Sequence, residues 1–336
     1  MTGAGAERRE VVFYEREGER LHCLVCPQSC RIPEGGVGFC RMRRHEGGKL
    51  WAINYGQVSA RHMDPIEKKP LYHFHPGSWI LSLGTLGCNL ACAFCQNWQI
   101  SQETVPTQYL SPRQAVEIAR RERGNLGIAY TYNEPLMWYE WVLDTAPLVH
   151  EAGLKNVLVT NGFINPEPLA RLLPHIDAMN IDLKAIREGF YREVCRGRLE
   201  PVLASIRQSV EAGVLVELTN LVIPGYNDAE EDVRALVDWV AALNPAIPLH
   251  LSRYHPDYHF AAPATPLETL QRAYEIAKEK LHYVYLGNVM GAGGEDTRCP
   301  SCQEVVISRR GMAVVSTRLA GGRCQHCGTE LPIVGV

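Results

Sequence analysis

Residues 155–184 read KNVLVTNGFINPEPLARLLPHIDAMNIDLK, and the prediction of the fold starts from this stretch. Two apolar runs of β-type composition, residues 155–160 and 178–184, enclose a segment of helical character. A strand, a helix and a second strand in this order are typical of a βαβ unit, in which a crossing helix joins two parallel strands. The stretch therefore predicts an α/β fold with a parallel sheet.

The same pattern continues on both sides of this unit. Six apolar runs occur within about 220 residues, fewer than the eight repeats of a closed barrel. We therefore expect a partial (β/α)6 TIM-like barrel, and a doubly wound sheet is the alternative that the pattern leaves open. Helix starts are expected at Ser111, Asp228 and Thr265, each with a polar residue three positions on. The four further runs are WILSLGTLG at 79–87, LGIAYT at 126–131, VLVELTNLVI at 214–223 and IPLHLSRY at 247–254.

Three cysteines follow the first of these runs directly. Residues 84–98, GTLGCNLACAFCQNW, place Cys88, Cys92 and Cys95 in a CxxxCxxC spacing. A four-iron cluster held by protein normally takes four cysteines, so three leave one iron with an open corner. A zinc site or buried structural cysteines are the alternative, but three thiolates in one short loop need a fourth ligand to complete a zinc tetrahedron. The spacing therefore favours a [4Fe–4S] cluster.

This loop, with Phe94 before its last cysteine, resembles the cluster loop of the radical S-adenosylmethionine (radical SAM) superfamily. The resemblance implies that S-adenosylmethionine binds the open iron through its amino and carboxyl groups. It also implies that the reduced cluster splits the sulfonium into methionine and a 5'-deoxyadenosyl radical, which abstracts hydrogen from a substrate. An electron donor is then implied as a partner.

A second resemblance lies at the end of the next run. The segment YTYNEP at 130–135 is similar to the GGE-like segment with which the superfamily binds the methionine moiety. The resemblance implies that Asn133 and Glu134 bind the cofactor, with the Glu134 carboxylate accepting from its amino group. The alternative for Glu134 is an acid that faces the N-terminus of a helix.

The later strand ends resemble those of the activating enzymes of glycyl radical enzymes. The matching segments are VTNGF at 159–163, IDLKA at 181–185 and SRYHP at 252–256. An aspartate precedes TNG in the activating enzymes, whereas this chain has Val159, which puts any cation site there in doubt. The residues that the match implies as contacts of S-adenosylmethionine are Asn161, Asp182, Lys184 and His255.

The other cysteines gather mainly at the two ends of the chain. Of twelve cysteines, eleven lie in three groups, and without a secretion signal metal binding explains them better than disulfides do. The C-terminal group has two CxxC pairs 21 residues apart, which is the spacing of a zinc ribbon, with an auxiliary iron–sulfur cluster as the alternative. The N-terminal group predicts either zinc or an auxiliary cluster. These two groups are Cys23, Cys26, Cys30 and Cys40, and Cys299, Cys302, Cys324 and Cys327.

Two smaller features are expected to be structural. Cys195 stands alone near the end of a predicted helix, and we expect a small buried residue. His73 and His75 alternate along PLYHFHPG, and we expect local hydrogen bonds rather than a metal pair.

The cysteine groups divide the chain into three expected parts: a cysteine-rich N-terminal module and linker at 1–70, a partial barrel at 71–292 and a zinc-ribbon-like module at 293–336. This arrangement resembles the radical SAM enzyme of the AmmeMemoRadiSam system, itself similar to pyruvate formate-lyase activating enzyme. That resemblance implies Memo-like and AMMECR-like proteins as partners. The substrate is then a glycine in a partner protein or a small molecule.

Charge and hydropathy argue against nucleic-acid-binding and membrane proteins. The formal net charge is -3, so no global positive field attracts nucleic acid or an anionic membrane. The N-terminal stretch MTGAGAERREVVFYERE is charged where a signal peptide is apolar, and we expect no membrane span and a cytoplasmic protein. The competing function is a non-catalytic metal-binding adaptor that docks a protein or RNA. Near-neutral charge argues against RNA.

Overall fold

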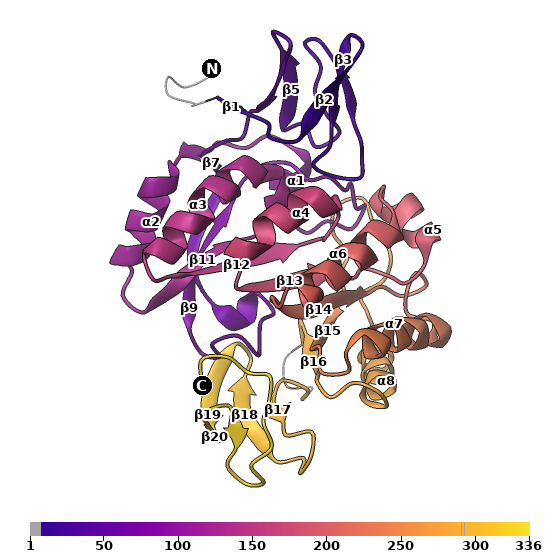
Figure 1. Cartoon of the computed structure of the whole chain (residues 1–336). Helices are drawn as coiled ribbons and strands as arrows, with labels where there is room; N and C mark the ends of the chain where they lie inside the picture. The colour runs from indigo at the N-terminus through magenta and orange to yellow at the C-terminus, as the bar shows by residue number, and fades with distance from the viewer. Residues whose placement is uncertain (1–7, 290, 292) are drawn as a thin grey trace.

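The computed structural model describes residues 8–289, 291 and 293–336, and its centre is one curved sheet (Figure 1). The sheet has eight strands in the order β16-β15-β14-β13-β12-β11-β9-β8. All neighbours pair in parallel except β8, which is antiparallel to β9. The strands are β8 (Ala60–Pro65), β9 (Trp79–Gly84), β11 (Asn125–Tyr130), β12 (Lys155–Thr160), β13 (Ala178–Asp182), β14 (Leu215–Val222), β15 (Leu249–Arg253) and β16 (Val284–Gly287).

The helices lie on the outer side of the sheet, as the connections between parallel strands require (Figure 1). Neighbouring helices pack in pairs, with α2 on α3, α4 on α6 and α7 on α8. The main helices are α2 (Pro112–Arg121), α3 (Tyr139–Glu151), α4 (Pro166–Leu172), α6 (Leu199–Glu211), α7 (Glu230–Leu243) and α8 (Leu267–Lys278). Short helical segments are η1 (Ile66–Lys68), α1 (Trp98–Gln102), η2 (Pro135–Trp138), η3 (Leu173–His175), α5 (Glu188–Phe190) and η4 (Tyr191–Cys195).

The α/β fold with a parallel sheet is confirmed, but the expected strand number is too low. All six expected runs are strands, and β16 adds a seventh parallel strand. This strand has four residues, too few for a visible sequence pattern, and pairing with β15 stabilises it. The antiparallel edge strand β8 comes from the segment that we expected to be a linker.

One of the three expected helix starts is confirmed. Ser111 Oγ accepts from the backbone N–H of Gln114, and Gln114 Oε1 accepts from the backbone N–H of Ser111, which forms a capping box on α2. Asp228 instead accepts from the N–H of Gly225, and α7 begins two residues later. Thr265 Oγ1 bonds the backbone of Val222 and Tyr254, so it ties two strand ends together rather than capping α8.

Residues 8–58 form a small all-β unit, called the head below, at one end of the molecule (Figure 1). Its buried residues, among them Leu21, Ile32 and Leu50, belong to the same core cluster as those of the sheet and its helices. The head therefore packs directly on the barrel. Its strands are β1 (Arg9–Glu10), β2 (Tyr14–Glu17), β3 (Arg20–Cys23), β4 (Arg31–Pro33), β5 (Arg43–Glu46), β6 (Lys49–Ala52) and β7 (Gln57–Val58), the last paired with β10 (Gln108–Tyr109).

Residues 293–336 form a second all-β unit, the ribbon, at the opposite end (Figure 1). Arg309 anchors it: this buried guanidinium donates to the Tyr72 carbonyl at 2.8 Å and lies 3.5 Å from Glu67 Oε1. The boundary expected at 292 falls on a residue outside the described part. The ribbon strands are β17 (Thr297–Arg298), β18 (Val305–Arg310), β19 (Ala313–Thr317), β20 (Leu319–Ala320) and β21 (Arg323–Cys324).

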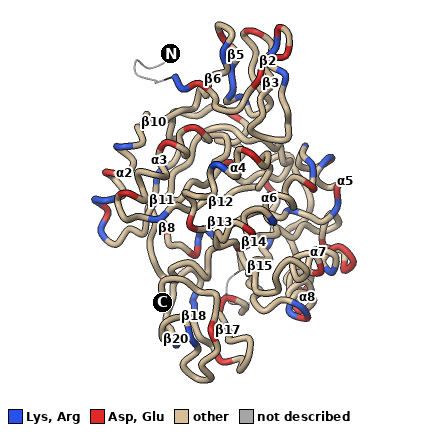
Figure 2. The backbone as a smooth tube through the Cα atoms, in the orientation of Figure 1, with Lys and Arg blue, Asp and Glu red and all other residues tan. Residues whose placement is uncertain are grey.

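Charged residues of both signs are interspersed along the outer helices (Figure 2). Among the described residues, no helix has both the length and the apolar composition that crossing a lipid bilayer requires.

Candidate active site

The cluster loop connects β9 to α1 at the carboxyl edge of the sheet. Its backbone is held from two sides: Gly87 N–H donates to the Ile100 carbonyl at 2.8 Å, and Ala91 N–H donates to the Cys195 carbonyl at 2.9 Å. Cys88, Cys92 and Cys95 all line one cavity of about 550 Å³, within the usual size range of small-molecule sites. The three thiols therefore face a shared space beside the strand ends.

The spacing of these three sulfur atoms fits an iron–sulfur cluster better than zinc. In the described part of the chain, only two sets of three or more Cys, His, Asp or Glu ligand atoms lie within 4.8 Å of one another, and the cluster loop forms neither. A zinc tetrahedron with Zn–S bonds of about 2.3 Å would bring its sulfurs to about 3.8 Å. In a four-iron cluster each cysteine binds a different iron, so its sulfurs stand further apart.

Cys195 lies directly behind the cluster loop. It is fully buried, as expected, and its nearby thiol lowers the pKa of Cys92. It is not among the residues that line the cavity. Cys195 therefore supports one cluster cysteine from the protein side and leaves the cavity side open. This contact could not be predicted from the sequence, because residues 92 and 195 come together only through folding.

Two asparagines fix the cluster loop. Asn133 Oδ1 accepts from the N–H of Thr85 at 3.0 Å, and its Nδ2 donates to the Gly87 carbonyl at 2.8 Å. Asn161 Nδ2 lies 3.6 Å from Cys88 Sγ and 2.9 Å from Asn89 Oδ1. Both residues line the cavity, yet their amides are already engaged by the loop. Positioning Cys88 is therefore a role that we did not predict for either.

Glu134 lies at the cavity wall with its carboxylate buried. One oxygen accepts from Thr160 Oγ1 at 2.7 Å and from the Leu136 N–H at 3.0 Å, and the other from the Asn161 N–H at 2.8 Å. The bond from the Leu136 N–H caps η2, so the helix-terminus alternative for Glu134 also holds in part. Burial raises the pKa of Glu134 to about 7. No ion pair reaches it from the described residues, so a bound amino group would supply its missing positive partner.

Asp182 and Lys184 follow β13 and face the same cavity. Their charged groups pair at 2.8 Å, and Lys184 Nζ lies 5.9 Å from the centre of the Phe94 ring. Asp182 keeps 36% of its side chain exposed, so it can still accept from a ligand hydroxyl. His255, by contrast, is exposed and does not line the cavity. The structure thus brings together five of the six residues that the resemblance implies.

Sequence reasoning missed the wall contributed by the segment before β9. Lys69 is buried at the cavity, where its Nζ pairs with Asp64 at 2.7 Å and lies 4.6 Å from the centre of the Tyr132 ring. Burial lowers the pKa of Lys69 to about 8, although Asp64 opposes the shift. Val159 also lines the cavity and brings no charge, so an aspartate contact has no counterpart at this position.

Comparison with known proteins agrees with this geometry. The sequence profile of the Radical SAM superfamily matches residues 83–240, which include the cluster loop and β11 to β14. An uncharacterised protein of Methanocaldococcus jannaschii, MJ0808, is 43% identical over 335 residues, covering 97% of this chain and 99% of its own length. The chain belongs to the radical SAM superfamily.

Two further similar proteins are more distant. The pyruvate formate-lyase-activating enzyme of Clostridium pasteurianum is 23% identical over 181 residues, which cover 50% of this chain and 72% of that enzyme. SuiB of Streptococcus suis shares the fold, with a TM-score of 0.50 and 15% identity over 65% of this chain and 49% of its own. The protein is thus a radical SAM enzyme with a homologue among activating enzymes.

The ribbon of this radical SAM enzyme brings its four cysteines to one point. Cys299 and Cys327 have their sulfurs 3.6 Å apart, Cys302 and Cys324 have theirs 3.7 Å apart, and all four lie within 4.8 Å of one another. These distances match a tetrahedron around one ion with metal–sulfur bonds of about 2.3 Å. The predicted single-metal site is therefore geometrically sound.

The histidines of the segment before β9 are not a metal pair. His73 is buried, with Nε2 at 2.8 Å from the Tyr285 hydroxyl and Nδ1 at 3.2 Å from the Pro332 carbonyl. It therefore joins the sheet to the end of the ribbon by local hydrogen bonds, as expected for His73. The same expectation fails for His75, whose buried Nε2 has no hydrogen-bond partner among the described residues.

Proposed function

We propose that this protein cleaves S-adenosylmethionine reductively at a [4Fe–4S] cluster on Cys88, Cys92 and Cys95. The observation that carries the proposal is the cavity of about 550 Å³ onto which all three thiols and the strand-end residues open. In the superfamily this chemistry releases methionine and a 5'-deoxyadenosyl radical, which abstracts hydrogen from a substrate. The residues described above suit the cofactor that this reaction needs.

The chain's own contribution is binding, orientation and exclusion of water. Asn133 and Asn161 hold the loop so that the three sulfurs keep one spacing. Glu134 offers a buried carboxylate to the amino group of the methionine moiety. Asp182 and Lys184 lie where ribose hydroxyls and a carboxylate can bind. His255 joins the set only if its exposed loop takes part when the cofactor binds.

The decisive measurement is the formation of 5'-deoxyadenosine. After anaerobic reconstitution and reduction with dithionite, wild-type protein is expected to form it, and Cys92→Ala is expected to form none. Cys195→Ala is a matched control, because this thiol touches Cys92 but lies outside the cavity, so both cluster and product should persist. Absence of product from wild-type protein with an intact cluster would refute the assignment.

For the substrate, we propose a glycine in a partner protein. This rests on the similarity to an enzyme named for activating pyruvate formate-lyase. The Memo-like and AMMECR-like proteins of the AmmeMemoRadiSam arrangement are the first partners to test. Incubation of each with the reduced enzyme and S-adenosylmethionine should give an organic radical signal on the partner by electron paramagnetic resonance. Product formation without a partner radical would point to a small-molecule substrate instead.

The adaptor alternative has little support. A docking module has no need of a cavity of this size lined by three thiols, a buried carboxylate and a lysine. Purified protein that contains zinc as its sole metal would support the adaptor function.

A further inference from the structure

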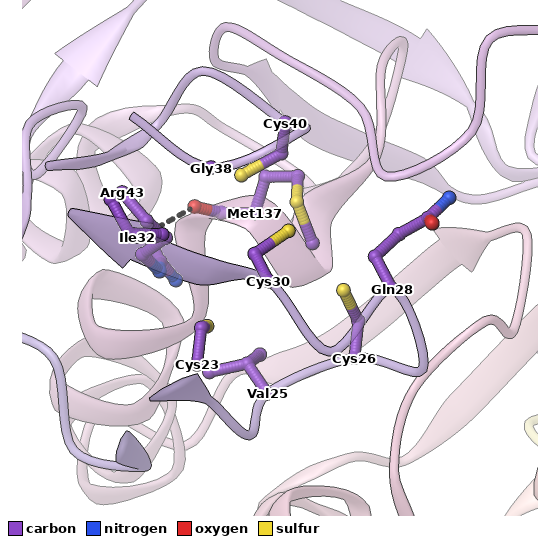
Figure 3. Close-up of a pocket in the computed structure, with 10 residues that line it drawn as sticks. All are labelled: Cys23, Val25, Cys26, Gln28, Cys30, Ile32, Gly38, Cys40, Arg43 and Met137. Atoms are coloured by element: carbon purple, nitrogen blue, oxygen red, sulfur yellow. Dashed lines mark hydrogen bonds between the residues drawn. The ribbon is translucent and has the colours of Figure 1, made fainter. Parts of the chain in front are cut away.

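The four head cysteines enclose a separate cavity (Figure 3). Cys23 lies at the end of β3, Cys26 and Cys30 lie in the turn that follows, and Cys40 comes from the next loop. All four are drawn around a common space that Met137 closes on the barrel side. The site is therefore formed by the head and completed by the radical SAM domain.

The sulfur spacing in the head differs from that in the ribbon. The sulfurs of the ribbon cysteines all lie within 4.8 Å of one another, whereas no three sulfurs of the head, which lies wholly in the described part of the chain, are that close. The head cysteines share this wider spacing with Cys88, Cys92 and Cys95. Since one chain shows both arrangements, the ribbon serves as an internal standard for a single metal ion.

Four thiolates around one zinc ion would lie about 2.3 Å from the ion and about 3.8 Å from one another. A cube of four irons and four sulfides places a different metal against each thiolate and so holds the sulfurs further apart.

The surroundings suit a buried anionic cluster. Cys23, Cys26 and Cys40 are each less than 9% exposed, and Val25 and Ile32 line the same space. The Phe39 N–H donates to Cys30 Sγ at 3.3 Å, a type of bond that adjusts the potential of iron–sulfur clusters.

One buried cation faces the thiols. The Arg43 guanidinium lines the cavity and pairs with Glu140 at 2.9 Å. It also donates to the Met137 carbonyl at 3.1 Å (Figure 3). A positive group held this firmly offsets part of the cluster's negative charge.

The head site lies next to the cluster loop. A methyl group added to Gly87, the residue before Cys88, would lie 2.6 Å from the Cys40 carbonyl oxygen. Gln28, two residues after Cys26, donates to the Asn89 carbonyl at 2.8 Å. The segments that carry ligands of the two sites are thus in contact at two points.

We infer that Cys23, Cys26, Cys30 and Cys40 hold a second [4Fe–4S] cluster, not zinc. Each of the four irons would be bound by a cysteine, so this cluster would have no free coordination position for S-adenosylmethionine. Its function would then be one-electron transfer. The inference does not depend on cleavage of the cofactor at the first cluster.

The test separates the two clusters by mutation. The full chain carrying Cys88→Ala, Cys92→Ala and Cys95→Ala leaves the head intact and should retain about four irons and four sulfides after reconstitution, against about eight of each in wild type. One zinc should remain in the ribbon. Dithionite should reduce the retained cluster by one electron and give an iron–sulfur signal in electron paramagnetic resonance.

A control assigns the retained iron to the head. Adding Cys299→Ser and Cys302→Ser to the triple variant should remove zinc and leave iron unchanged, whereas adding Cys26→Ser and Cys30→Ser should remove the iron. A triple variant with no iron and two zinc ions, or iron that disappears with the ribbon cysteines, would overturn the inference.

Discussion

At the scale of single residues, the site depends on side chains whose partners are fixed before any cofactor binds. Glu134 accepts three hydrogen bonds, and Asn161 supplies its own N–H to Glu134 while its amide reaches Cys88. One residue is thereby coupled to the carboxylate and to the cluster loop. Changes here should affect binding of the cofactor more than folding of the sheet.

Glu134→Gln tests the carboxylate. The glutamine NH2 group would replace one carboxylate oxygen and so face a donor, Thr160 Oγ1–H or the Asn161 N–H, without accepting from it. The substitution also removes the negative charge that Glu134 offers to the amino group of S-adenosylmethionine. Affinity for S-adenosylmethionine should fall at least about tenfold, equal to about 1.4 kcal/mol, with iron content unchanged. Calorimetric titration of the reconstituted enzyme measures this, with the exposed Glu193→Gln as control. Equal affinities would remove Glu134 from the binding site.

At the scale of elements, the cluster loop is pressed between the strand ends and the head. Gly87 has φ +85, and a Cβ there would lie 2.5 Å from Met42 Cγ and 2.6 Å from the Cys40 oxygen. Only glycine combines this backbone conformation with such a close approach. The loop and the head therefore share a contact that a single methyl group would break.

Gly87→Ala should lower the free energy of unfolding by more than the strain of its backbone conformation alone explains. Gly124→Ala is the matched control, since Gly124 has φ +73 and nothing within 4 Å of an added Cβ. The control should lose about 1–2 kcal/mol of unfolding free energy. Gly87→Ala should lose a further amount of about 1–3 kcal/mol from overpacking and should also bind less iron. Urea unfolding and iron analysis measure both, and equal losses in the two variants would show that the contact is unimportant.

At the scale of the whole molecule, the ribbon is attached through buried polar groups. Arg309 pairs with Glu67, which is 3% exposed, and lies 4.2 Å from the centre of the Tyr72 ring. Arg309→Ala would leave the Glu67 carboxylate buried without its cation, which typically costs about 3–5 kcal/mol. The neighbouring exposed Arg310→Ala should change stability by less than about 0.5 kcal/mol. Chemical denaturation compares them, and a loss below about 1 kcal/mol in Arg309→Ala would contradict the anchoring role.

The junction between ribbon and sheet should also respond to acid. Burial lowers the pKa of His73 to about 4. Arg309 and His250 also lower this pKa, and the Glu217 carboxylate raises it. His73 stays neutral in the folded protein, whereas the unfolded chain binds a proton there as the pH falls below about 6.5. The free energy of unfolding therefore decreases below pH about 6.5, and the decrease is complete near pH 4. The free energy of unfolding lost between pH about 6.5 and 4 is about 3 kcal/mol.

His73→Gln provides the reference for this effect. The stability of wild type relative to the variant should decline between pH about 6.5 and 4 and stay constant above pH about 7. Unfolding by urea across this range gives the difference. A pH-independent difference would show that His73 does not titrate in this way.

The sequence by itself determined the parallel α/β architecture and the grouping of eleven cysteines into three candidate metal sites. Periodic apolar runs specify strands locally, and CxxxCxxC or paired CxxC spacings place thiols within reach of one metal site through a few bonds of chain. The resemblance at the strand ends also selected five residues that do face one cavity. These features are readable because the residues concerned are close in sequence or occupy equivalent strand ends.

Only the tertiary structure decided what lies around those motifs. The support of Cys92 by Cys195, the cavity wall at Lys69 and the contact of Gly87 with Cys40 each join segments far apart in the chain, and no local pattern specifies which distant segments will meet. The short strand β16 exists because β15 offers it a partner. The spacing of thiols across the head, which distinguishes a cluster from zinc, is likewise set by packing of loops in three dimensions.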